Sequence, residues 1–439
     1  MIVDPWKSVS LLNNPMVFNI KRLLLSVIGL LMLSHNVTAQ EILYENKIYT
    51  PNVKTVLLHP VGNETGFPAI RLQSSDRLIL RFDDMDEGVK NYQYTFVHCN
   101  ADWTPSRLSK NEYLNGITDN FIQNYEFSFN TFYPYTHFHL TFPNQNVQFK
   151  ISGNYLLIVY ENSINKPVLT RRFIVYEEVA NVGMEVRRPT DVRFNNTHQE
   201  VDIYLNHAGY VIPDPYVDLK LTILQNQRWD NALTTLKPLF VQQGRIIYNY
   251  DNGENLFQGG NEFRVFDMKN LQVLGIGMMK TELDQNNWNV YLFRESPRRT
   301  DRYVFWQDIN GQYVIRRQNS SNPHTESDYA WVDFQLLVPS PFAEGDIFVW
   351  GQLSDWQLLP EFRMNYDYEK RAYTAQILLK QGYYNYLYAL QTDNGQADLM
   401  PVEGSYWEAE NEYTAIFYHR EIGIRYDRVI GFARLSSRR

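Results

Sequence analysis

The chain has 439 residues, more than one ordinary domain contains, and 44% of them are hydrophobic, which is enough for several cores. Its net charge is −8 and it has no long run of lysine or arginine, so binding to nucleic acid or to an anionic membrane surface is not predicted. Aromatic residues make up 15% of the chain, and 31 tyrosines are among them, a content typical of β-rich proteins.

The N-terminal segment has the pattern of a cleavable signal peptide. Lys21 and Arg22 precede an apolar run over residues 23–33, and Val37 and Ala39 supply the small residues that cleavage requires. A run of this length covers only about half of a hydrocarbon core, so a membrane anchor is not predicted.

Cleavage is therefore expected after Ala39, with export of the mature chain to the periplasm. Residues 1–39 carry three basic residues and one acidic residue, so their removal takes the net charge from −8 to −10. The start of translation stays open between Met1 and Met16. Because Cys99 is the only cysteine, no intramolecular disulfide can form, and the exported chain must rely on large cores.

The mature chain reads as short strands separated by turns. Aromatic and β-branched residues alternate with polar ones in segments bounded by Asp, Asn, Gly and Pro. The predicted strands cover residues 77–82, 138–142, 155–160, 171–178, 201–205, 217–225, 245–250 and 262–268. Asn310-Gly311 predicts a hairpin turn. The periodicity of two lapses only over 106–123, where a helix or coil is expected, so the predicted fold class is all-β, with tandem immunoglobulin-like β-sandwich domains.

Two polar segments predict the domain boundaries. One lies near Asn181, after a completed strand, and the other covers residues 317–330, which contain Pro323 and show no apolar periodicity. The expected organisation is a signal peptide (1–39), an N-terminal β domain (40–180), a middle β-sandwich (181–322) and a C-terminal domain (323–439), each large enough for its own core.

The most specific sequence pattern lies in the N-terminal domain. It begins with alternating aromatic residues from Tyr92 and reaches a polar turn, His98-Cys99-Asn100-Ala101-Asp102-Trp103; further on comes Gly153-Asn154-Tyr155. This pattern resembles the N-terminal domain of the type IX secretion system plug proteins of Bacteroidetes. The resemblance leaves open whether His98, Cys99, Asn100, Asp102, Trp103, Gly153, Asn154 and Tyr155 are structural residues or part of an interface.

The resemblance implies a non-enzymatic periplasmic protein at the inner face of the outer membrane. Such a protein plugs the periplasmic opening of the translocon barrel when no substrate is engaged. The implied partner is that outer-membrane barrel, with no cofactor, no nucleic acid, no direct membrane insertion and no small-molecule ligand.

The C-terminal third resembles early-set immunoglobulin-like modules, some of which bind glycans. Its strand-and-turn pattern places four aromatic residues, Trp350, Trp356, Tyr383 and Tyr384, where such modules carry sugar-stacking rings. An exported glycan-binding protein is therefore the alternative function. It requires these rings to form an exposed row, whereas burial in a sandwich core would remove it.

Catalytic and metal sites are weakly indicated. His98 and Cys99 are neighbours on a predicted strand, so their side chains should point to opposite faces and the cysteine should be buried and inert. The acidic cluster from Asp83 to Glu87 lacks the spacing of an EF-hand, and a solvated turn is expected there, with a calcium site of another type left open. A hydrolase would need two convergent carboxyl groups with shifted pKa values, and no catalytic motif is present, so an enzyme is not predicted.

Overall fold

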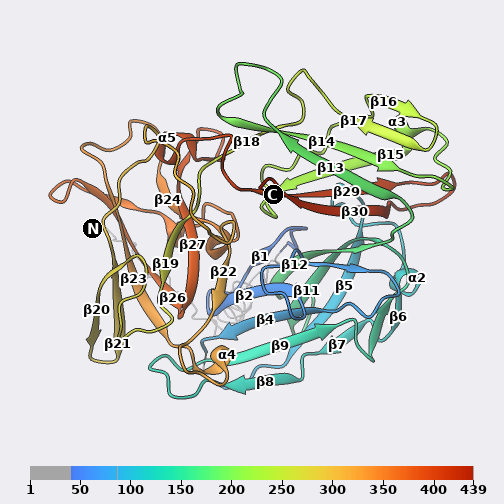
Figure 1. Cartoon of the computed structure of the whole chain (residues 1–439). Coiled ribbons are helices and arrows are strands. Elements are labelled where there is room, and N and C mark those ends of the chain that lie inside the picture. Colours follow the sequence, from blue (N-terminus) through green and yellow to red (C-terminus); the bar gives the residue numbers. More distant parts are fainter. Residues whose placement is uncertain (1–40, 87, 439) are drawn as a thin grey trace, which may run out of the picture. The chain divides into compact units, whose positions relative to one another are not determined.

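The computed structural model describes residues 41–86 and 88–438, and the segment from Ile42 to Arg439 forms one compact unit. The predicted signal peptide and its predicted cleavage site lie outside the described residues. Within the described ranges, no helix has both the length and the apolar character needed to span a membrane. Nearly all strand pairs are antiparallel, and they build three two-sheet sandwiches, so the predicted all-β fold class is confirmed (Figure 1).

The first sandwich is built from the N-terminal strands. Its first sheet contains β1 (Lys47–Ile48), β3 (Ala69–Arg71), β5 (Tyr92–Cys99), β7 (Asp119–Phe121), β11 (Gly153–Glu161) and β12 (Pro167–Tyr176). Its second sheet contains β2 (Val53–Pro60), β4 (Leu78–Asp84), β9 (Thr136–Phe142) and β8 (Asn124–Phe127), in that order. Between the sheets, Phe96 packs against the rings of Phe142, Phe149 and Phe173 at centroid distances of 5.0–5.7 Å. Aromatic strand residues thus supply this core, as their alternation predicts.

A short helix interrupts the first sandwich where the periodicity of two lapses. Helix α2 (Lys110–Tyr113) is followed by β6 (Leu114–Gly116), which pairs with β10 (Val147–Phe149). Ser109 caps α2 in a capping box with Glu112. The expected excursion over 106–123 is therefore one helical turn between short strands.

The second sandwich combines strands from two distant parts of the chain. One sheet contains β13 (Asn181–Arg187), β14 (His198–Asn206), β16 (Phe240–Gln242), β17 (Arg245–Tyr248) and β18 (Leu256–Gln258). The other contains β15 (Leu219–Gln225), preceded by α3 (Pro215–Asp218), together with β29 (Glu412–His419) and β30 (Arg428–Ser436). In Figure 1 the red strands β29 and β30 lie beside the green β15, and the register pairs Leu219 with His419.

The third sandwich lies entirely between β18 and β29 in the sequence. One side contains β19 (Arg264–Asp267), β22 (Tyr313–Ile315), β24 (Ile347–Trp350), β27 (Gly382–Gln391) and β28 (Ala397–Asp398). The other sheet contains β20 (Met278–Asp284), β21 (Asn287–Leu292), β23 (Tyr329–Leu337), β25 (Asn365–Asp367) and β26 (Ala372–Lys380). The short helices are α4 (Pro323–Glu326), η1 (Gln352–Ser354), η2 (Pro360–Phe362) and α5 (Met400–Glu403). The third sandwich is thus inserted into the second.

The strand pairing adds a feature that the expected domain boundaries did not include. Strands β29 and β30 come from the segment expected to form the C-terminal domain, yet they pair with β15. Strands β19 to β21 come from the expected middle segment, yet they belong to the sheets of the third sandwich. The division of the chain at residues 181 and 323 stays a prediction.

The hairpin predicted at Asn310-Gly311 is wrong, although the turn itself is present. Both residues have positive φ, +52° and +77°, as a tight two-residue turn requires. No strand precedes the turn within residues 302–309. Side chains hold this segment instead: Trp306 donates from Nε1 to the Phe263 carbonyl (2.8 Å), and Asp308 accepts the Phe263 amide (2.6 Å). Strand β22 pairs with β27 rather than with this segment.

Candidate functional site: two junction faces of the first sandwich

The first sandwich uses the outer faces of both its sheets to contact the rest of the chain. Side chains of one sheet that point away from the core pack against the second sandwich. We call this contact the apolar junction: Cys99, Leu156, Ile158 and Ile174 meet Leu224, Ile416, Tyr418 and Val429. Outward residues of the other sheet meet the third sandwich. We call that contact the charged junction: Arg81, Asp83 and His137 meet His324, Tyr329 and Lys380.

His98 and Cys99 lie on opposite faces of β5, as alternation predicts. The His98 ring packs edge-on against Tyr155 (5.0 Å between centroids), and its Nε2 lies 3.1 Å from the Ser152 carbonyl oxygen. Cys99 is fully buried at the apolar junction. Burial lowers the pKa of His98 to about 4 and raises the pKa of Cys99 to about 12. The two side chains do not form a nucleophile–base pair, and the interpretation of Cys99 as a buried, inert thiol fits the structure.

The turn after Cys99 connects the first sandwich to the second through hydrogen bonds. The side-chain amide of Asn154 donates to the Asn100 carbonyl (2.9 Å), and its oxygen accepts from the Tyr418 hydroxyl (2.9 Å). The Ala101 amide donates to Asp427 (2.9 Å), a carboxylate that also bonds Arg420 (2.7 Å). Asn154 is completely buried, so these hydrogen bonds take the place of the hydrogen bonds that its side chain would otherwise make with water.

Trp103 closes the edge of the same junction. It has a φ of +64°, an uncommon conformation for a bulky residue, and its ring lies edge-on to Trp229 at 5.0 Å. The guanidinium of Arg172 stacks 4.4 Å from the Trp103 ring. Asp102 is exposed and accepts the Thr104 amide (3.1 Å), which holds the turn. Asp102 and Trp103 therefore shape a turn against the second sandwich.

Gly153 and Tyr155 support the motif from β11. A Cβ atom on Gly153 would lie 2.1 Å from His98 Nε2, so only glycine lets the imidazole reach the Ser152 carbonyl. Tyr155 is buried in the first core and donates its hydroxyl to the Ile151 carbonyl (2.8 Å). The sequence motif thus gathers around one end of β5 and β11, next to the second sandwich.

A family model matches the part of the chain that carries the motif. The description "Type 9 secretion system plug protein 1st domain" belongs to a family model that matches residues 53–177, which span most of the first sandwich. A crystal structure of a hypothetical protein from Parabacteroides merdae ATCC 43184 is 33% identical, with a TM-score of 0.87, and the match covers 90% of this chain and 100% of that one. The chain belongs to the type 9 secretion system plug protein family. It is therefore a component of type 9 secretion, and its family points to a structural, non-enzymatic role.

Two further comparisons add nothing to the assignment of this plug-family protein. No curated protein matches the sequence. The C-terminal domain of the Streptococcus pyogenes antigen I/II-family protein AspA is 7% identical over 87% of this chain and 98% of that one, with a TM-score of 0.16, too low to support any argument.

The charged junction of the plug-family protein is centred on Asp83. The register pairs Asp83 of β4 with His137 of β9, so both side chains leave the sheet on the same face. The Asp83 carboxylate accepts from His137 Nδ1 (2.7 Å), from the Tyr329 hydroxyl (2.7 Å) and from Lys380 Nζ (2.5 Å). Asp83 and Lys380 are at most 1% exposed, so this ion pair is shielded from water.

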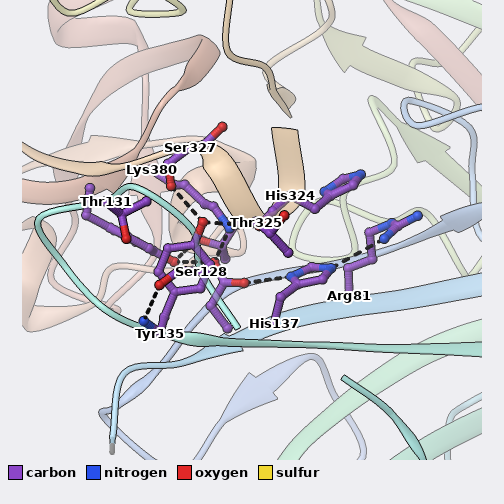
Figure 2. Close-up of polar contacts among 12 residues, drawn as sticks. Arg81, Ser128, Thr131, Tyr135, His137, His324, Thr325, Ser327 and Lys380 are labelled. Atoms are coloured by element: carbon purple, nitrogen blue, oxygen red, sulfur yellow. Dashed lines mark hydrogen bonds and ion pairs between the residues drawn. The ribbon is translucent and has the colours of Figure 1, made fainter. Parts of the chain in front are cut away.

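Aromatic rings and carbonyl groups complete the surroundings of Lys380 (Figure 2). Its ammonium lies 4.0 Å from the Tyr135 ring centroid and donates to the His324 carbonyl (2.6 Å). The Tyr135 hydroxyl donates to the Ser327 carbonyl (2.7 Å). The rings of His137 and His324 stack at 5.2 Å, so residues from β9, α4 and β26 meet at one buried point.

The electrostatics of this junction keep Asp83 ionised and the imidazoles neutral. Burial alone would raise the pKa of Asp83, but Lys380 and the hydrogen bond from His137 outweigh it, and the pKa is lowered. Burial lowers the pKa of His137, and burial with the nearby Arg81 lowers the pKa of His324 to about 2. The expectation of a solvated acidic turn is wrong for Asp83 and Asp84, which are both fully buried because the third sandwich covers β4 on one face and the first core lies on the other.

A loop after β8 strengthens the same junction. The Asp328 carboxylate, nearly buried, accepts the backbone amides of Phe132 (2.8 Å) and Tyr133 (3.2 Å). Trp331 donates from its indole nitrogen to the Tyr133 hydroxyl (2.9 Å). This loop of the first sandwich is therefore held by β23 and the residues before it.

The four aromatic residues singled out in the C-terminal third do not form an exposed row. Trp350 and Tyr384 are at most 1% exposed, whereas Trp356 and Tyr383 are half-buried. Trp350 packs edge-on against Trp356 at 4.8 Å, and Tyr384 stacks on Phe266 at 5.0 Å inside the third core. The glycan-binding alternative has no support in this geometry.

Metal chemistry is equally unsupported within 41–86 and 88–438, where no group of three acidic, histidine or cysteine residues is arranged to hold an ion. In the acidic cluster, Lys90 neutralises part of the charge by binding Asp84 (3.1 Å). Glu87, the last residue of the cluster in which a calcium site was considered, lies outside the described residues.

Sequence reasoning missed an exposed aromatic edge on the first sandwich. It consists of five rings on β7, β8 and the loop that follows, with exposed fractions of 57% for Phe121, 43% for Tyr125, 61% for Phe127, 72% for Phe129 and 44% for Phe132. Strand β8 is the last strand of its sheet. The alternation of Tyr125, Phe127 and Phe129 in the sequence could have indicated this edge. Such alternation is typical of a buried strand face, but no sheet covers these rings.

Proposed function

We propose that this plug-family protein occludes the periplasmic opening of the outer-membrane translocon barrel of type 9 secretion when no substrate is engaged. The observation that carries the proposal is the family match on residues 53–177 of the first sandwich. The proposal includes export by the N-terminal signal segment and residence in the periplasm, at the inner face of the outer membrane. A wide pore without cargo would leak solutes, so a soluble protein that seats reversibly in its mouth has a clear physical purpose.

The aromatic edge supports this proposal as a contact surface. Interfaces that form and separate are anchored by a few aromatic side chains within a polar surround. Exposed rings of this size usually mark an interaction site, since clusters of apolar side chains in water are costly. The edge also lies within the part of the chain that matches the plug domain.

The strand geometry adds backbone groups to the same edge. Ser128 donates its amide to Tyr135 (2.9 Å), which continues the β8–β9 register beyond Phe127. Because hydrogen-bonded and non-hydrogen-bonded pairs alternate in an antiparallel ladder, the amides and carbonyls of Tyr125 and Phe127 point away from β9. A strand or turn of the barrel rim could pair with these groups while it covers the rings.

The test is a mild-detergent purification of the tagged protein from native envelopes, with co-purifying proteins quantified by mass spectrometry. We expect recovery of one very large outer-membrane barrel, and more of it when cargo is depleted. The variant Tyr125→Ser, Phe127→Ser, Phe129→Ser should lower that recovery at least tenfold, since anchor residues each contribute on the order of 1–2 kcal/mol.

A control replaces three apolar residues of the second sandwich that are even more exposed: Val192→Ser, Val211→Ser and Ile422→Ser, where the side chains are 78–84% exposed. This control should leave barrel recovery unchanged. Absence of any barrel from the wild-type preparation would refute the plug complex. Equal losses in the two triple variants would instead refute the aromatic edge as its contact surface.

A further inference from the structure

A cavity of about 350 Å³ lies beside the charged junction. Its walls come from β2, β4 and the loop after β2 on one side, and from β22 of the third sandwich on the other; they include His59, Glu64, Arg81, Val314 and Arg316. Neither the motif residues nor the Asp83–Lys380 ion pair line it. The cavity shares Arg81 with the charged junction and no residue with the apolar junction.

Strand register gathers positively charged and titratable nitrogens next to this cavity. His59 pairs with Ile79, and Arg81 pairs with Leu57 across β2 and β4 and with His139 across β4 and β9. Paired residues and residues two apart share a face of a sheet, so His59, Arg81 and His139 leave the sheet on one side. That side faces the third sandwich, since Leu57 belongs to the third core.

Three buried nitrogens of these residues lack a partner among the described residues: Arg81 Nε, His59 Nε2 and His139 Nδ1. His59 is only 4% exposed, and its Nδ1 lies 2.9 Å from the Pro60 carbonyl oxygen. Because a carbonyl oxygen can only accept a hydrogen bond, Nδ1 of the neutral ring carries the proton and Nε2 is unprotonated. A buried polar atom without a hydrogen-bond partner destabilises the fold. A ligand that supplies the missing hydrogen bond therefore binds more favourably.

The charge balance of the cavity favours an anion. Arg81 and Arg316 supply two positive charges, and the one wall carboxylate, Glu64, is already paired with Arg316 at 2.6 Å. Among the described residues, the only polar side-chain contact of Arg81 is with His137 Nε2 (3.3 Å). A guanidinium with free N–H groups in a partly enclosed site is suited to bind an oxyanion.

We propose that this cavity binds one small oxyanionic group, a carboxylate or a phosphate, held by Arg81 and by His59 in its protonated form. The proposal is independent of the plug function. The anion accepts from Arg81, and protonation turns His59 Nε2 from a bare lone pair into a second donor. Binding is thus coupled to the uptake of one proton.

This coupling sets the pH dependence of binding. The groups that face His59 and Arg81 are His139 and His137 of β9, Arg316 directly after β22, Glu64 and Glu126. Burial and the two arginines lower the pKa of His59 in the empty site, although Glu64 opposes them. The anion should raise it again, so affinity should increase as the pH falls from 8 to 6, by up to about tenfold per unit for one proton.

The experiment is isothermal titration of the mature protein with sodium phosphate and, separately, with sodium acetate, each at constant ionic strength against sodium chloride. We expect saturable binding that strengthens toward pH 6. Stronger binding of phosphate or of acetate identifies which oxyanion fits the cavity. Arg81→Gln should reduce binding at least tenfold, whereas Arg294→Gln, at an exposed position away from the cavity walls, should not.

His59→Gln provides a second, independent check, because it should retain part of the affinity and lose its pH dependence. Circular dichroism confirms that each variant is folded. Absence of saturable binding by either anion, or equal binding by wild type and the folded Arg81→Gln variant, would overturn the proposal. Unchanged pH dependence in His59→Gln would overturn the role of this imidazole.

Discussion

The two junctions of the first sandwich reach comparable burial by different chemistry. At the apolar junction, Leu156 and Ile158 pack against Ile416 and Val429, and hydrogen bonds lie at the motif turn and at Val429, whose amide donates to Ser152 Oγ (3.1 Å). At the charged junction, Asp83 and Lys380 are equally inaccessible but depend on each other. Truncation of one apolar side chain removes only that side chain's part of the packing energy. Removal of either partner of a buried ion pair leaves the other charge buried without compensation, which strongly lowers the free energy of unfolding. A single substitution at each junction should therefore distinguish the two junctions by the size of the loss in the free energy of unfolding.

The largest effect is expected from Lys380→Met. Removing the ammonium leaves the Asp83 carboxylate buried without its cation, which should lower the free energy of unfolding by about 3–5 kcal/mol. Urea unfolding followed by fluorescence measures the change. Adding Asp83→Asn in the same chain should restore much of the loss, because the uncompensated charge is gone. A double variant as unstable as the single one would show that the pair does not behave as a unit.

Leu156→Ala measures the apolar junction in the same assay. The substitution removes a fully buried side chain and leaves a cavity, so a loss of about 2–4 kcal/mol is expected. Unlike the effect of Lys380→Met, this loss should not vary between pH 7.5 and pH 5.5. A pH-dependent loss would mean that charged groups contribute to the apolar junction as well.

Gly153→Ala tests the contact between the motif histidine and β11. Because the new Cβ would lie 2.1 Å from His98 Nε2, the imidazole must leave the Ser152 carbonyl. We expect a loss of about 1–3 kcal/mol, from strain and from the broken hydrogen bond. The same substitution at Gly209, where φ is also positive but nothing lies within 4 Å of the Cβ that alanine would add, gives the cost of the backbone strain alone.

Acid should weaken the charged junction through its histidines. The pKa values of His137 and His324 are lowered in the fold, so below the unfolded value of about 6.5 the unfolded chain binds more protons than the folded one. The contribution of the two neutral histidines to stability is therefore complete above that pH. It is lost as the pH falls, by up to about 1.4 kcal/mol per pH unit for each histidine. His324→Gln should remove about 1 kcal/mol of the decrease between pH 7.5 and 5.5. An unchanged decrease would exclude His324 as its source.

The smallest effect is expected from Asp102→Ala. This exposed side chain supports its turn by accepting the Thr104 amide, and water can replace it, so the change should be about 0.5 kcal/mol. Thermal unfolding is sensitive enough to detect it. A loss as large as that of Gly153→Ala would place Asp102 in the junction rather than beside it.

Local sequence patterns predicted the strands and the inert cysteine because both depend on alternation within one strand. Of the family-motif residues, Cys99 lies in the apolar junction and Asn100 and Asn154 hydrogen-bond beside it, but the motif did not indicate their partners. The charged junction was not predictable, since Arg81, Asp83, His137 and His139 alternate with apolar residues as they would on a solvated face. Only the packing of the third sandwich reveals that this face is covered, as the contact between Asp83 and Lys380, 297 residues apart, shows.

The insertion of the third sandwich into the second has a consequence for the order in which the three sandwiches can fold. A chain that emerges N-terminus first can complete the first sandwich once β12 has appeared at Tyr176. The second sandwich must wait, because β15 has no strand partner until β29 follows more than 180 residues later. During that interval the backbone groups of β15 are unpaired, so the incompletely synthesised chain passes through a stage that a chaperone could protect by covering this strand.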